Sequence, residues 1–201
     1  SEAGELMHGL INRSIEVFLS TTYGASAWAD ILRRADYDGD GFEAMLTYPD
    51  ELTAWVIEAA VDLLGKDRET ILEDLGTYMV SHPSVTRIRR LLRFGGVNFT
   101  DFLLSLGELP GRAKLAVSDL VLPELELNED GQDHYILETH SDWPGYGHVL
   151  VGVLRAMADE YGALVFLEHR QEDCGKETVS IQLLESGFSS GREFQLAQQA
   201  G

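Results

Sequence analysis

The spacing of hydrophobic residues changes near Pro123, and this change limits the folds that the chain can adopt. Between Leu10 and Leu122, apolar residues recur mainly at the three- and four-residue spacing of amphipathic helices. Beyond Pro123, Leu125 and Leu127 alternate with glutamates, which is the two-residue spacing of a half-buried strand. The sequence therefore predicts an α+β fold, in which a helical N-terminal part packs on a C-terminal antiparallel sheet with one long helix.

The expected elements follow these two periods. Helices are expected over residues 10–23, 28–32, 50–64, 71–81, 88–95, 99–109 and 149–161. Strands are expected over residues 122–127, 134–140, 165–169 and 178–184. We expect a single domain over residues 7–185, with a helical part over 7–122, a sheet-plus-helix part over 123–185 and a tail over 186–201.

Pro110 interrupts the last helical stripe, which begins at Phe99. Proline has no N–H for the helix ladder and clashes with the carbonyl four residues back, at a cost of about 3 kcal/mol. The sequence therefore predicts that this helix stops at Leu109.

Composition and charge exclude several classes of partner. The chain has 201 residues, 44% of them apolar, and a net charge of −19 from 34 acidic and 15 basic residues. Such a field repels nucleic acids and anionic membranes, so neither is expected as a partner. The sequence has no apolar run of membrane-spanning length, its start lacks a secretion signal, and Cys174 is its single cysteine. These features are typical of an acidic cytoplasmic protein.

One acidic segment matches the first half of a calcium-binding loop. Asp36, Asp38, Asp40 and Gly41 occupy positions one, three, five and six of an EF-hand pattern. The bidentate glutamate of position twelve is replaced by Thr47, so we expect an acidic turn and no calcium site.

The sequence offers little support for an enzyme. None of the six histidines forms a zinc-binding spacing with another, and no nucleophile elbow or phosphate-binding glycine loop occurs. Cys174 lies in a polar turn without a feature that would activate its thiol. Neither a zinc site nor a catalytic constellation is expected.

Several short motifs follow one another in order over nearly the whole chain. They are Met7 to Asn12, Tyr23-Gly24, Trp28, Tyr48-Pro49-Asp50, Ile71 to Gly76, Leu91 to Leu109, Pro123 and Val149 to Leu154. This ordered set resembles the heme nitric oxide/oxygen binding family (H-NOX), which includes the N-terminal heme domain of the soluble guanylate cyclase β subunit.

The resemblance implies heme b between the helical part and the sheet, with two anchors. The family's proximal histidine donates the axial nitrogen to iron, and its Tyr-x-Ser-x-Arg motif holds the propionates. In register, the histidine position falls on Pro110, which has no donor atom. The propionate motif falls on Thr139, Ser141 and Trp143, so only its serine is kept, and Asp142 adds an acid. Both usual anchors are therefore missing.

Two interpretations remain open. In the first, heme is held by another ligand, either His82 or, as a second choice, His140; His82 is equally a residue at the helix break before a proline. In the second, heme binding is lost and the fold serves as an interaction module or takes another apolar ligand. The family's porphyrin-contacting proline matches Pro123, and its distal wall matches Ile11 and Ile15. An apolar wall would favour nitric oxide or carbon monoxide over oxygen.

The resemblance thus implies a non-catalytic sensor or regulatory module with degenerate or rewired heme binding. In the family, ligand binding moves one part against the other, and a histidine kinase or nucleotide cyclase reads that movement. Because the sequence covers one domain, we expect the output to come from a separate signalling protein. The acidic surface favours a partner with a basic face.

Overall fold

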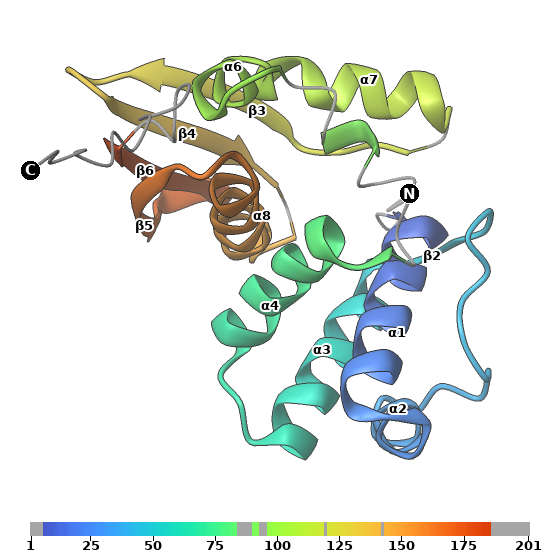
Figure 1. Ribbon diagram of the computed structural model, residues 1–201. Helices are drawn as coiled ribbons and strands as arrows, with labels where there is room; N and C mark the ends of the chain where they lie inside the picture. The colour runs from blue at the N-terminus through green and yellow to red at the C-terminus, as the bar shows by residue number, and fades with distance from the viewer. Residues whose placement is uncertain (1–5, 84–89, 93–95, 119, 142, 186–201) are drawn as a thin grey trace, which may run out of the picture.

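The computed structural model describes residues 6–83, 90–92, 96–118, 120–141 and 143–185. Figure 1 shows a helical part on one side and a sheet with its long helix on the other, so the predicted α+β architecture is confirmed. The helical part contains α1 (Gly9–Tyr23), α2 (Ala25–Arg34), α3 (Asp50–Leu64) and α4 (Arg68–Ser81). The helix expected over 88–95 lies largely outside the described residues, of which 90–92 are helical.

The sheet is antiparallel throughout. It contains β3 (Glu124–Glu129), β4 (His134–His140), β5 (Leu164–Gln171) and β6 (Lys176–Glu185), in the spatial order β3-β4-β6-β5. The long helix α8 (Tyr146–Tyr161) lies against the sheet and begins earlier than predicted. A short ladder between β1 (Leu6–His8) and β2 (Thr47–Pro49) was not predicted, because three-residue strands are too short to show a period.

The segment around Pro110 differs from the prediction. Helix α6 (Phe99–Leu104) is followed by a 3₁₀ turn, η2 (Leu106–Glu108), and a new helix, α7 (Leu109–Ala116), begins there. Pro110 lies in the first turn of α7, where a missing N–H costs little because the first N–H groups of a helix have no intrahelical partner. The prediction that a helix stops at Leu109 is therefore wrong: a new helix begins at Leu109, with Pro110 in its first turn.

Helices α4 and α8 join the two parts by a close crossing. A Cβ added to Gly76 of α4 would lie 2.0 Å from the carbonyl oxygen of Val149, and one added to Gly152 of α8 would lie 1.9 Å from that of Glu73. Each helix therefore needs a glycine where the other backbone passes.

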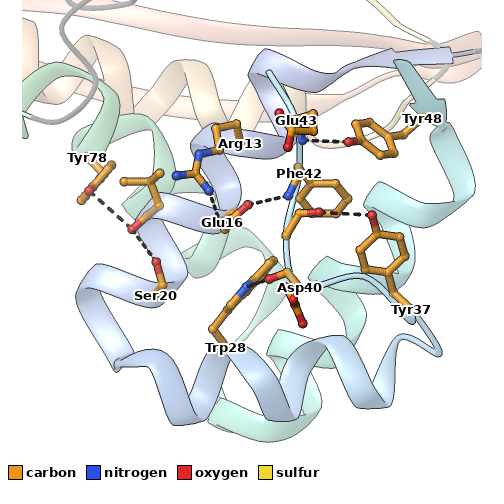
Figure 2. A network of polar contacts seen from close by, with 12 residues as sticks. Arg13, Glu16, Ser20, Trp28, Tyr37, Asp40, Phe42, Glu43, Tyr48 and Tyr78 are labelled. Carbon is orange, nitrogen blue, oxygen red and sulfur yellow. Dashed lines mark hydrogen bonds and ion pairs between the residues drawn. The ribbon is translucent and has the colours of Figure 1, made fainter. Parts of the chain in front are cut away.

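The acidic segment from Asp36 to Gly41, which was predicted to be a turn, is held near α1 by a hydrogen bond from the next residue, Phe42 (Figure 2). The Phe42 N–H donates to the buried Glu16 carboxylate at 2.7 Å, and Glu16 also pairs with Arg13. The Trp28 indole donates to the Asp40 carbonyl at 3.3 Å. The segment is thus a structural loop, and no described group of three or more histidine, cysteine or acidic side chains could hold a metal ion.

Two hydrophobic clusters form the interior. One joins α1, α2, α3 and α4, and the other joins α6, α8 and the sheet. Trp143 follows β4 in sequence but packs in the first cluster, while Val80 of α4 packs in the second. No described helix is long and apolar enough to cross a membrane.

Candidate functional site

An apolar pocket lies between the helical part and the sheet, with an internal volume of about 130 Å³. Both parts and the segment that joins them contribute side chains, most of them aliphatic. The lining residues are Leu10, Ile11, Ile15, Thr53, Leu75, Met79, Leu91, Leu92, Leu106, Leu109, Leu120, Leu122, Pro123, Leu125, Thr139, Trp143, Tyr146, Val149, Leu150 and Val153. A ligand here would contact both parts at once.

Five of the residues singled out in the sequence line this pocket. They are Ile11, Ile15, Pro123, Thr139 and Trp143. Residues from α1, β4 and the segments before β3 and α8 thus meet at one place, although the two residues of α1 are more than a hundred positions from the other three in the chain.

The proposed iron ligands and the proline lie elsewhere. Pro110 and the exposed His140 share a shallow polar depression with Glu138, outside the apolar pocket. The ring of His82 stacks on Tyr78 with centroids 4.4 Å apart, and His82 is not among the pocket-lining residues. From the segment around Pro110, the side chains that reach the pocket belong to Leu106 and Leu109.

Three pocket residues with polar or sulfur atoms were missed from the sequence, namely Thr53, Met79 and Tyr146. Met79 lies four residues after Leu75 on the apolar stripe of α4, so its spacing could have indicated it. Tyr146 opens α8, and this turn falls before the helix start that the hydrophobic spacing predicted. Burial and the nearby Asp50 carboxylate raise the pKa of the Tyr146 phenol, so it stays protonated.

Trp143 forms one wall and is held from several sides. The backbone N–H of Trp143 donates to the Ser141 hydroxyl at 3.0 Å. The Arg68 guanidinium lies over the Trp143 ring, 5.6 Å from the ring centroid. Tyr146 meets the ring edge to face, with centroids 5.3 Å apart. Ser141, which the resemblance matches to the serine of the propionate motif, therefore helps to position Trp143.

Two buried polar atoms belong to pocket-lining side chains. Thr139 is 2% exposed and Trp143 is 8% exposed. Neither Thr139 Oγ1 nor Trp143 Nε1 has a hydrogen-bond partner within the part of the chain that the structure describes. Both atoms are covered by neighbouring atoms and present almost no surface to the pocket, whose exposed lining is almost wholly carbon. Unpaired buried polar groups of this kind cost stability.

A buried carboxylate fixes the start of α8 beside the pocket. Glu177 of β6 is 1% exposed and accepts hydrogen bonds from the N–H groups of Gly145 at 2.9 Å and Gly147 at 3.0 Å. It also pairs with His169 Nε2 at 2.7 Å. A negative charge at a helix N-terminus is favourable, and here it links the sheet to the helix turn that carries Tyr146.

Heme does not fit the described lining of this pocket. The lining includes no histidine, lysine or arginine, so neither the usual axial nitrogen nor a cation for the propionates is present among those residues. A phenol with a raised pKa is a poor iron ligand, which leaves the Met79 thioether. The volume of about 130 Å³ is also close to that of an engineered cavity of roughly 150 Å³ that holds benzene, whereas a porphyrin is a macrocycle of four pyrrole rings linked by methine bridges.

The fold and the pocket together define an α+β module with a ligand pocket between its two parts. The family model described as Haem-NO-binding (HNOB) matches residues 8–169, and the chain therefore belongs to the H-NOX family. This family is a sensor module and not a catalyst, which confirms the expected family and the absence of an enzyme function.

Relatives share low identity with this chain. Soluble guanylate cyclase 89Db of Drosophila melanogaster is 22% identical, over 89% of this chain and 27% of its own length. Soluble guanylate cyclase gcy-31 of Caenorhabditis elegans is 23% identical, over 77% of this chain and 22% of its own length. The chain thus spans about a quarter of the length of these curated relatives.

Solved H-NOX structures share the fold. The H-NOX protein from S. oneidensis in the Fe(II)NO ligation state has a TM-score of 0.76 at 12% identity, covering 89% of this chain and 100% of that one. An oxygen-binding H-NOX domain related to soluble guanylate cyclases has a TM-score of 0.67 at 17% identity, covering 93% of this chain and 100% of that one.

Proposed function

We propose that this chain is a non-catalytic sensor or regulatory module in which the heme site of the family is degenerate. The observation that carries the proposal is the pocket lining, which is apolar on all its described sides and includes neither a histidine nor a cationic side chain. A pocket of this kind still binds apolar molecules, because burial of apolar surface needs no specific partner.

The pocket is suited to signalling because the same elements line it and join the two parts. Helices α4 and α8 both contribute lining residues, and they cross in close contact at Gly76 and Gly152. A ligand that presses on α4 or α8 changes this crossing and shifts one part against the other. We propose that residues 7–185 act as one domain and that a separate cytoplasmic signalling protein, such as a histidine kinase or a nucleotide cyclase, reads this shift.

The absorption spectrum of protein purified from heme-replete cells tests the proposal. We expect a folded, monodisperse protein without a stoichiometric Soret band in the ferrous or nitric oxide state. A stoichiometric band would overturn the proposal and show that the site was rewired around a new ligand.

Two variants then identify that ligand. Met79→Leu removes the thioether that lines the pocket, and His82→Ala removes the imidazole that stacks on Tyr78 outside it. If Met79→Leu loses the Soret band and His82→Ala keeps it, the iron is bound in the pocket. In that case the apolar wall of Ile11 and Ile15 would favour nitric oxide or carbon monoxide over oxygen.

A further inference from the structure

The side chains that line the pocket present almost no hydrogen-bonding group to a ligand. The Thr53 hydroxyl is already paired, because it donates to Asn12 Oδ1 at 2.7 Å. Thr139 Oγ1 and Trp143 Nε1 are covered by neighbouring atoms. The exposed lining is almost wholly carbon, so a polar group of a ligand would lose its water without gaining a partner among the described residues.

Volume and lining together set the size and the class of the ligand. The volume of about 130 Å³ is close to that of the engineered apolar cavity of roughly 150 Å³, which stays free of water and binds benzene. Water is held in a cavity by several polar partners, and the described lining offers almost none. A molecule of about six or seven carbon atoms therefore fits, and water competes with it poorly.

The walls that such a ligand would touch come from both parts of the molecule. Ile15 belongs to α1 and Leu75 to α4, whereas Leu150 lies on α8. Met79 adds an unbranched side chain that can adjust to the outline of a ligand. A ligand here buries apolar surface against both parts, so its binding stabilises the folded chain.

We propose that the pocket binds a hydrocarbon of about the size of benzene or toluene and rejects molecules of similar shape that carry a hydroxyl group or a charge. This inference rests on the proposed function, since heme in the pocket would leave no room for such a ligand. Burial of carbon supplies the affinity, and the carbon lining penalises each polar group that enters.

Toluene and phenol are a nearly isosteric pair of probes, because they carry a methyl group and a hydroxyl group on the same ring. Both are uncharged at neutral pH. The ligand-dependent increase in the thermal midpoint of the full chain measures their affinities. We expect toluene to raise the midpoint and phenol to bind roughly tenfold more weakly or worse, because its hydroxyl would be buried without a partner.

Two substitutions of one wall residue test whether toluene binds in this pocket. Leu150 is only partly buried, so the chain can accept a larger side chain there. Leu150→Phe fills the pocket, and we expect it to abolish the effect of toluene. Leu150→Ala enlarges the pocket, and we expect naphthalene, which has two rings, to gain affinity relative to toluene. Leu104→Ala changes an exposed residue outside the pocket and should leave all affinities unchanged.

A third variant tests the origin of the selectivity. Met79→Gln keeps a side chain of similar length and places an amide group on the wall. We expect the preference for toluene over phenol to shrink in this variant, because the hydroxyl of phenol then has a partner.

Three results would overturn the inference. If toluene does not raise the midpoint of the wild-type chain, or raises it equally in Leu150→Phe, the pocket is not a hydrocarbon site. If phenol binds as tightly as toluene, the lining does not select against polar groups. The Soret measurement separates these failures from that of the proposed function: a stoichiometric heme band sinks the proposed function, whereas failure of toluene without such a band sinks only this inference.

Discussion

At the scale of single residues, the buried carboxylate of Glu177 holds the start of α8 beside the pocket. Its buried carboxylate accepts from two backbone N–H groups at the start of α8 and pairs with His169. A glutamine keeps the shape but can turn an NH₂ group toward donors that need an acceptor. We expect Glu177→Gln to lower the free energy of unfolding by about 2 kcal/mol, measured by urea denaturation.

The control for this prediction is Glu168→Gln, which changes an exposed glutamate of the neighbouring strand. It should stay within about 0.5 kcal/mol of wild type, as surface substitutions generally do. Equal effects of the two variants would show that the links of Glu177 to α8 add no stability.

His148 gives the molecule a pH-dependent stability. Burial lowers the pKa of His148 from its usual 6.5, and the neighbouring His169, whose ring centroid lies 3.8 Å from that of His148, lowers it further. The nearby carboxylates of Glu177, Glu69 and Glu73 raise this pKa, but their effect is smaller. As the pH falls below about 6.5, the unfolded chain takes up a proton that the folded chain resists, so the free energy of unfolding decreases. Above that pH the contribution of this residue is constant.

We therefore expect His148→Gln to flatten the dependence of unfolding free energy on pH below about 6.5. Urea denaturation at several pH values measures the slope. His140→Gln alters an exposed histidine, so it is the control. The interpretation is wrong if both variants change the slope equally.

Pro110 tests whether a residue that matches a heme-binding position of the family in sequence also lies in the pocket of this structure. The family's axial histidine falls here in register, yet Pro110 faces a polar depression while Leu106 and Leu109 line the pocket. We expect Pro110→His to bind no heme in a spectroscopic titration, like the wild type. A Soret band that appears only in the variant would contradict this placement.

At the scale of elements, the hydrophobic period predicted the helices and strands better than it predicted their ends. Strand β4 and helix α4 end as expected, because alternation and a proline mark their limits. Helix α7 was missed because proline disrupts a helix interior but is favoured in a first turn, and the period alone does not distinguish the two. The walls of the pocket from α1, β4 and Trp143 came from the family resemblance. Met79 lies on the apolar stripe of α4 and could have been predicted from its spacing, whereas Tyr146 precedes the predicted start of α8 and needed three-dimensional packing.

The crossing of α4 and α8 depends on two glycines, and one of them offers a sharp test. Gly152→Ala would place a methyl group within 1.9 Å of the Glu73 carbonyl oxygen, so the two helices must separate. We expect a loss of about 3 kcal/mol in unfolding free energy. Gly111→Ala in α7 adds a methyl group that meets no described atom within 4 Å. It should stabilise the protein by roughly 0.5–1 kcal/mol through helix propensity, and a comparable loss in both variants would refute the close-crossing argument.

At the scale of the whole molecule, the two parts share their interiors. Trp143 from the sheet part packs in the cluster of the helical part, and Val80 of α4 packs in the cluster of the sheet part. The pocket also draws its lining from both. Neither part can bury these surfaces alone, so we expect residues 7–185 to unfold as one cooperative unit.

Amide hydrogen exchange can test this cooperativity at two distant core positions, Ile15 in α1 and Ile181 in β6, both of which are buried. If the parts unfold together, Gly152→Ala must raise the exchange rates of both amides by the same factor, because each then exchanges through the same global opening. Glu177→Gln acts from the sheet side and should likewise accelerate Ile15. Acceleration confined to one part would mean that the parts open separately, and a ligand in the pocket would then act by holding them together instead of by shifting a single folded unit.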